Sequence, residues 1–170
     1  MTTSRRLLPV LLLPLLLAVM AFKETSPQSV PAAVDGQPLS ERAAQDQLPM
    51  AKSALWGRLA QCPSHFDTKT ALYSITVSPQ VKAMDGDTVT VNGFVLPLDG
   101  SDETRHFLLT KRTPVCMYCP PGEPNEVIEV KSKQAVEWND SMVTMKGRFT
   151  LVNNGEKAIF FALDDAEKVK

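Results

Sequence analysis

Apolar and polar residues alternate through much of the second half of the chain, with the period of two that is typical of β-strands. The clearest example is segment 88–97, in which Val89 and Val91 share one face. After Gly93 the apolar residues become continuous. A glycine at such a change of pattern predicts a bulge or a sharp bend in the strand.

The same alternation predicts the remaining strands. They are expected at 105–110, 126–130, 142–152 and 158–163, with a weak edge strand at 71–76. Turn signals separate them, namely Asp-Gly-Ser-Asp at 99–102 and Asn-Asn-Gly at 153–155. The polar segment 132–140 is interpreted as a connection, with a turn of helix expected at 135–138.

Two of the expected strands resemble each other. Segment 89–93 reads Val-Thr-Val-Asn-Gly, and segment 143–147 reads Val-Thr-Met-Lys-Gly. A glycine inside each strand lets a small sheet bend until it closes on itself. Five strands with two such bends predict a small five-stranded barrel of the OB type, and a β-sandwich is the alternative. Such barrels serve many functions, so the fold alone does not indicate one.

A short helix is expected before the strands, at 49–60. Its first residue is a proline, which suits the start of a helix, and Leu55, Trp56 and Leu59 recur at helical spacing. The following Cys-Pro-Ser-His segment at 62–65 is expected to be a loop. The fold class is therefore all-β with a short N-terminal helix.

Residues 1–21 are typical of a secretory signal peptide. Arg5 and Arg6 precede the apolar stretch 7–22, and Val19 and Ala21 near its end are small residues at the cleavage-site spacing. The apolar stretch would reach about 24 Å as a helix, which is short of a bilayer core of about 30 Å. Cleavage is therefore favoured over an uncleaved membrane anchor, and we expect an exported, periplasmic protein.

The rest of the chain divides into a linker at 22–48 and a domain at 49–170. The linker is rich in Pro, Ser, Gln and Ala, with a helical turn expected at 40–44. Without its two signal-peptide arginines the chain has 16 basic and 19 acidic residues, a net charge of −3. Nucleic acid is not an expected partner, because phosphate binding needs a basic surface.

The segment with most candidate chemistry is 113–126, Thr-Pro-Val-Cys-Met-Tyr-Cys-Pro-Pro-Gly-Glu-Pro-Asn-Glu. It lies between two expected strands and contains Cys116 and Cys119, two of the three cysteines. We expect a rigid loop that presents two thiols from a β scaffold. Two thiols at this spacing can hold one metal ion, and thiolate ligands favour zinc or copper(I).

Additional metal ligands are left open by the sequence. His106 lies at the start of the strand that leads into the loop, where it is either a third ligand or an exposed strand residue. Cys62 and His65 form a second pair at the same spacing, which would complete a Cys3His set if the two pairs met. Glu126 is either a ligand, a hydrogen-bond partner of a histidine or a solvated carboxylate.

Two other interpretations of the cysteine pair remain open. In an oxidising compartment a Cys116–Cys119 disulfide would staple the loop as a protein-interaction surface. A thiol–disulfide redox role is less favoured, because Pro120 and Pro121 prevent the helix whose dipole lowers the thiol pKa in such proteins. The chain shows no nucleophile–base set, phosphate loop or paired-carboxylate motif, so nothing in the sequence argues for an enzyme.

Three segments resemble an uncharacterised bacterial family, a domain of unknown function found in small exported or lipid-anchored proteins. They are 81–98 with its Gly-Phe-x-x-Pro-Leu motif, 106–109, and 116–126 with its Cys-x-x-Cys-Pro-Pro motif. The resemblance extends over roughly 56–162. Many relatives have a Cys-x-His before the paired prolines, where this chain has Tyr118, and many have a lipid-anchor cysteine that this chain lacks.

The resemblance implies an exported β domain with a site in the cysteine loop. Genes of this family often lie beside those of ABC-type transporter permeases, which implies an accessory role at an inner-membrane transporter complex. Together with the cysteine pair, this predicts a zinc- or copper-binding accessory protein.

Overall fold

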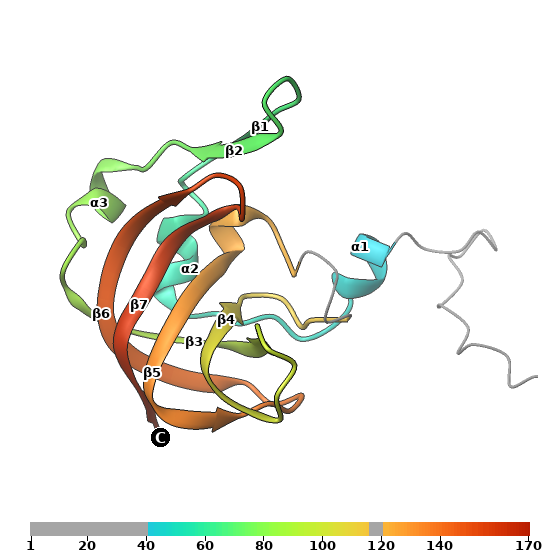
Figure 1. The fold of residues 1–170 in the computed structure, drawn as a ribbon, viewed down its shortest axis with the longest axis vertical. Helices are drawn as coiled ribbons and strands as arrows, with labels where there is room; N and C mark the ends of the chain where they lie inside the picture. The colour runs from blue at the N-terminus through green and yellow to red at the C-terminus, as the bar shows by residue number, and fades with distance from the viewer. Residues whose placement is uncertain (1–40, 116–120) are drawn as a thin grey trace, which may run out of the picture.

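The computed structural model describes residues 41–115 and 121–170 (Figure 1). The elements are α1 (Glu41–Gln45), α2 (Ala54–Leu59), β1 (Ser64–Asp67), β2 (Leu72–Ile75), α3 (Pro79–Lys82), β3 (Thr88–Pro97), β4 (Glu103–Thr110), η1 (Pro124–Glu126, a 3-10 turn), β5 (Val127–Glu137), β6 (Val143–Asn154) and β7 (Ile159–Val169). No helix within these two ranges is long and apolar enough to cross a membrane. The predicted signal peptide lies outside the described residues.

Strands β3 to β7 form a closed barrel in the order β3-β4-β5-β7-β6. Strand β3 closes it by pairing with β4 through its second half and with β6 through its first half. The β5–β7 pair is parallel, and the other neighbours are antiparallel. The prediction of an all-β protein with a small five-stranded barrel is therefore confirmed.

The two repeated glycines lie where strands approach too closely for a side chain. A Cβ on Gly93 would come within 2.8 Å of the Leu109 Cγ atom and the Thr110 carbonyl oxygen. A Cβ on Gly147 would lie 2.8 Å from the Asp164 carbonyl oxygen, and the β6–β7 register shifts at this point. Both glycines therefore permit the bends that the repeat predicted.

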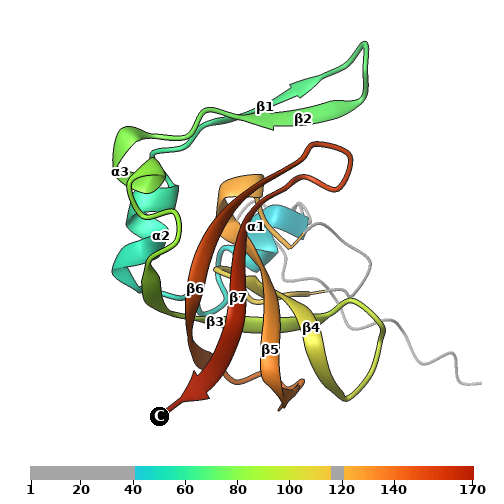
Figure 2. The ribbon, with the colours of Figure 1, turned by 60° about the vertical axis from the view of Figure 1, so that its left-hand side comes forward.

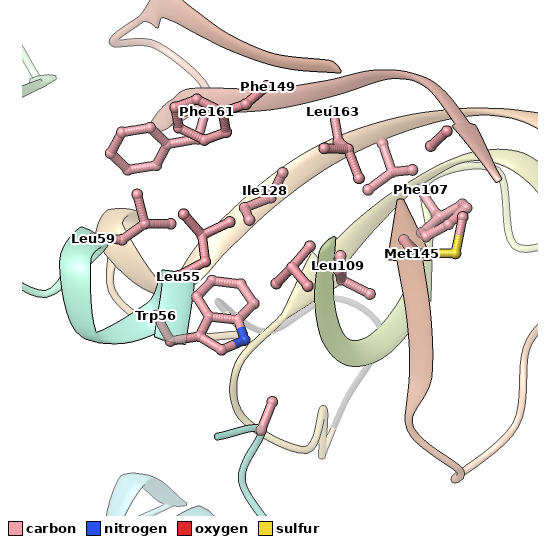
Figure 3. Packing of buried hydrophobic residues seen from close by; sticks show 14 of the residues in the cluster. Leu55, Trp56, Leu59, Phe107, Leu109, Ile128, Met145, Phe149, Phe161 and Leu163 are labelled. Carbon is pink, nitrogen blue, oxygen red and sulfur yellow. The ribbon is translucent and has the colours of Figure 1, made fainter. Parts of the chain in front are cut away.

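The barrel interior is filled with large apolar side chains, and α2 packs against it (Figure 3). The helix buries Leu55, Trp56 and Leu59, the three residues whose spacing predicted it. The Trp56 indole Nε1–H donates a hydrogen bond of 2.7 Å to the Asn92 carbonyl oxygen, so the polar atom of this buried ring is satisfied. The predicted helix exists, although it is shorter than 49–60.

Strands β1 and β2 form a separate hairpin that projects from the barrel (Figure 2). The expected loop at 62–65 is wrong at its C-terminal end, because β1 begins at Ser64 and pairs with β2. The expected helical turn at 135–138 is also wrong, because β5 continues to Glu137, which pairs with Glu103 of β4. Both polar segments become strands by pairing with another strand, β1 with the adjacent β2 and the end of β5 with the start of β4.

Candidate functional site

The cysteine-containing loop leaves the barrel after β4 and returns to it at η1. Cys116 and Cys119 lie outside the described residues, so the metal prediction for this pair stays a prediction. The structure describes the chain up to Val115 and again from Pro121. These two ends, and the groups that hold them, define the candidate site.

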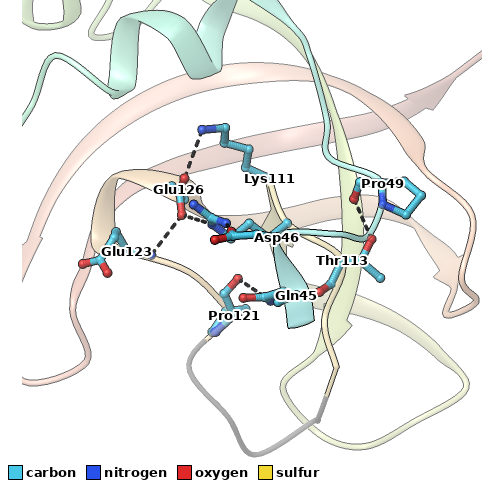
Figure 4. A network of polar contacts seen from close by, with 9 residues as sticks. Gln45, Asp46, Pro49, Lys111, Thr113, Pro121, Glu123 and Glu126 are labelled. Carbon is cyan, nitrogen blue, oxygen red and sulfur yellow. Dashed lines mark hydrogen bonds and ion pairs between the residues drawn. The ribbon is translucent and has the colours of Figure 1, made fainter. Parts of the chain in front are cut away.

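Glu126 is the centre of a polar network that joins the two described ends of the loop (Figure 4). Glu126 is only 6% exposed, and each of its two carboxylate oxygens binds a different cation. The Arg112 Nε–H donates to Oε2 at 2.6 Å, and the Lys111 ammonium donates to Oε1 at 3.0 Å. The Glu123 backbone N–H donates to Oε2 at 3.3 Å. One carboxylate thus connects the chain before the loop with the chain after it.

The electrostatics of Glu126 follow from this arrangement. Burial alone would raise the pKa of the Glu126 carboxyl, because it disfavours the charged form. The hydrogen bonds from Arg112, Lys111 and the Glu123 backbone outweigh burial, so the pKa of Glu126 lies below its usual value. The carboxylate is therefore ionised at neutral pH and is already occupied by its own partners.

The N-terminal segment makes a second set of contacts with the two ends of the loop. The Gln45 side-chain amide of α1 donates to the Thr113 carbonyl at 2.9 Å and to the Pro121 carbonyl at 3.4 Å, which lie on opposite sides of the cysteines. Asp46 pairs with the Arg112 guanidinium. Gln45 is buried, so this end of the predicted linker is packed against the two described ends of the loop (Figure 4).

A third contact ties the start of the loop to the chain before α2. The Thr113 hydroxyl donates to the Pro49 carbonyl at 2.7 Å. Next to it, the Ala51 N–H donates to the Lys111 carbonyl at 2.8 Å. Residues 111–113 are thus held by both side-chain and backbone bonds.

Cys62 and His65 occupy different surroundings. The Cys62 thiol is fully buried, accepts a hydrogen bond of 3.3 Å from the Ser78 N–H, and lies 3.7 Å from the Ser78 hydroxyl. Its carbonyl accepts a bond of 3.0 Å from the Asn125 side chain in η1. His65 is exposed on β1. The Cys62 backbone therefore lies beside the base of the loop, while its thiol bonds to Ser78.

His106 lies on β4, with its side chain about half exposed. Its Nε2 atom is 2.8 Å from Glu129 Oε1 on the neighbouring strand β5. Within residues 41–115 and 121–170, no three His, Cys, Asp or Glu side chains are grouped so that they could hold a metal ion. A metal role for His106, Cys62 or His65 stays a prediction.

The network residues Lys111, Arg112 and Gln45 were not predicted from the sequence. One local signal was present, since Glu123 and Glu126 have the spacing of a capping box and form one at η1. That signal indicates a turn of helix but not the two cations. The remaining contacts join residues that are far apart in the chain.

An apolar groove of about 820 Å³ adjoins the returning end of the loop. Its walls come from the β3–β4 turn, the β6–β7 turn and the segment 121–124. The lining residues are Tyr73, Leu96, Pro97, Leu98, Asp99, Gly100, Leu108, Pro121, Gly122, Glu123, Pro124, Val127, Glu156, Lys157, Ala158 and Ile159. The returning end of the loop, residues 121–124, therefore also forms one wall of this groove.

A comparison with protein-family profiles identifies one family. The profile described as "Protein of unknown function (DUF3299)" matches residues 27–160. A crystal structure of a DUF3299 family protein from Pseudomonas aeruginosa PAO1 matches with 20% sequence identity and a TM-score of 0.47, over 72% of this chain and 87% of that one. A search of curated proteins finds no match. Because the profile covers most of its length, the chain belongs to the DUF3299 family.

Proposed function

We propose that this protein is an exported binding protein that holds a zinc or copper(I) ion through Cys116 and Cys119. In this role it acts as an accessory component beside an inner-membrane transporter. The cysteine spacing supports the metal, because two thiols three residues apart can share one ion. The transporter link is supported by the family resemblance, and the signal-like segment 1–21 supports export.

The observation that carries the proposal is that both ends of the cysteine loop are fixed to the same frame. Gln45 bonds to the carbonyls of Thr113 and Pro121, and Glu126 connects Arg112 with Glu123. A free loop loses conformational entropy when its ligands are ordered around an ion. Fixed ends reduce that loss, so they favour binding by a loop that offers two ligands.

The buried carboxylate at the centre of the network is not a free ligand in this proposal. Glu126 is engaged by Arg112 and Lys111. Two thiolates then dominate the site, and thiolates favour soft ions such as copper(I) or the borderline ion zinc. Zinc usually has four ligands, so the two further positions would be filled by His106, by water or by a group from a partner.

Native mass spectrometry tests this proposal directly. The chain from residue 22 would be purified without reducing agent, and its mass measured with and without added zinc or copper(I). We expect one bound ion, which is lost in Cys116→Ser and in Cys119→Ser. Cys62→Ala is the matched control, because the Cys62 thiol is buried against Ser78, and it should retain the ion.

A different result in the same experiment would overturn metal binding. This result is a mass two hydrogens lower, with no ion taken up even after reduction. It would favour a second candidate function, in which a Cys116–Cys119 disulfide staples the loop as a protein-interaction surface. The apolar groove beside Pro121 and Pro124 favours that candidate over an enzyme. Reduction of a model disulfide substrate, lost in Cys116→Ser, would instead indicate redox chemistry.

A further inference from the structure

The apolar groove has no part in the metal proposal, and its surface indicates a ligand of its own. Leu96, Val127 and Ile159 are buried side chains of three different strands that line it. Leu98 extends this surface and is 47% exposed. Large apolar side chains gathered at a concave site are typical of binding surfaces rather than of ordinary solvent-facing ones.

The groove adjoins the projecting β1–β2 hairpin, whose position relative to the barrel is drawn in Figure 2. Tyr73 of β2 lines the groove and is 36% exposed. Its ring packs on Phe66 of β1 at a centroid distance of 4.7 Å. The Tyr73 N–H donates to the Gly155 carbonyl at 3.0 Å, which attaches the hairpin to the β6–β7 turn. A surface that runs from a groove onto a hairpin suits an extended chain better than a compact small molecule.

The lining of the groove restricts how such a chain can be recognised. Pro97, Pro121 and Pro124 contribute no backbone N–H, so at these three positions the groove offers shape and apolar contact but no hydrogen-bond donor from the main chain. We therefore expect the side chains of the ligand to supply much of the recognition. Large apolar side chains fit this surface best.

Charges in the lining select the polar part of the ligand. Asp99, Glu123 and Glu156 contribute three carboxylates, against one ammonium from Lys157. All four residues are exposed. An acidic border repels polyanions and attracts Lys or Arg side chains.

We propose that this groove is the docking site for an extended segment of a partner protein that carries large apolar residues interspersed with Lys or Arg. The apolar side chains contact Leu98, Tyr73 and the groove surface, and the cationic ones approach Asp99 and Glu156. This inference is independent of the metal, because none of these groups belongs to the cysteine pair.

Fluorescence anisotropy with synthetic peptides tests the proposal on the chain from residue 22. The probe is a labelled peptide of four Leu-Pro-Lys repeats, whose prolines keep it extended. One control peptide replaces each Lys with Glu, and another replaces each Leu with Ser. We expect the first peptide to bind and both controls to bind at least tenfold more weakly. Equal binding of the Lys and Glu peptides would overturn the charge argument.

Paired variants locate the site. Leu98→Asp should weaken binding of the Leu-Pro-Lys peptide by about tenfold, whereas Met142→Asp should not, although Met142 is 46% exposed and thus closely matched. Glu156→Lys should weaken it several-fold, with the exposed Asp140→Lys as the charge control. Equal effects within either pair would contradict the proposal.

Other occupants of the groove give distinct results. Peptide binding that appears only after residues 22–40 are removed would assign the groove to the chain's own N-terminal segment. A doubled native mass that Leu98→Asp reduces would assign it to a second copy. Either result overturns the proposal. Unchanged peptide binding in Cys116→Ser and Cys119→Ser would separate this inference from the metal proposal.

Discussion

The barrel interior and the Glu126 network are both buried, but they are held together by different forces. The interior is apolar, and its largest side chains include Phe107, Phe149 and Phe161. Burial of their surface is non-directional and tolerates small changes in shape. The network instead joins one carboxylate to two cations through hydrogen bonds of 2.6 and 3.0 Å. Such bonds depend on direction and on the charge of each partner.

This difference indicates separate tasks for the two regions. Backbone pairing between strands and the apolar core together hold the barrel closed. The network adds specific bonds where the chain leaves Thr110 and returns at Val127, the first residue of β5. A polar network of this kind defines one position for a loop, although it contributes less to stability than apolar packing of similar extent. Variants of the two regions should therefore affect stability and binding differently.

The largest expected effect lies in the barrel. In Gly147→Ala, the new Cβ would overlap the Asp164 carbonyl oxygen and lie 3.0 Å from the Ala166 Cα atom, both of which are backbone atoms that cannot rotate away. We expect a loss of about 2–3 kcal/mol in the free energy of unfolding, measured by urea denaturation. Gly57→Ala is the control, because a Cβ there meets nothing within 4 Å. It should stabilise α2 by about 0.5–1 kcal/mol. Similar losses in both variants would contradict the close approach at Gly147.

A smaller effect is expected in the network. Glu126→Gln keeps the shape of the side chain but removes the charge that Arg112 and Lys111 share. Both cations are partly exposed and can be hydrated. We therefore expect the free energy of unfolding to fall by about 2 kcal/mol, which is less than the full penalty of a buried unpaired charge. Glu167→Gln removes a surface partner of Lys133 and should leave the urea midpoint unchanged. An unchanged midpoint in Glu126→Gln would show that the network does not stabilise the fold.

The smallest effect is the pH dependence of that same carboxylate. The pKa of Glu126 is lowered from the usual 4.5, so its stabilisation is fully present above pH 4.5 and is lost as the pH falls through the lowered pKa. The difference in stability between the wild type and Glu126→Gln should therefore shrink below pH 4.5. Asp67 and Glu167, whose pKa values are also lowered, are present in both proteins and cancel in this comparison. A difference that stays constant down to pH 3 would contradict the assignment.

The barrel was predictable because its signals are local. Alternation, turn residues and the repeated glycines each act within a few positions, and they are sufficient to predict the strands from β3 to β7. The errors fell on polar strands such as β1 and the end of β5. Most of their residues are polar, and most are exposed, so only pairing with a partner strand marks them as strands, and no clear alternating pattern does.

The network was not predictable because its contacts are not local. Gln45 and Thr113 are 68 positions apart, and Lys111 and Glu126 are 15 apart. Pairing of β4 with β5 places Lys111 opposite Glu126, and tertiary packing brings Gln45 to Thr113. Nothing local distinguishes Lys111 or Arg112 from an ordinary solvated cation. The sequence could indicate the cysteine loop as the candidate site, but not how its ends are held.

A competitive zinc titration of the wild type and Glu126→Gln, with reduced thiols at pH 7, tests most directly the claim that this network prepares the cysteine loop for binding. The account predicts one ion per chain in both proteins, with about tenfold weaker affinity in Glu126→Gln and no change in Glu167→Gln. Equal affinities in the wild type and Glu126→Gln, or no binding by the wild type, would contradict it.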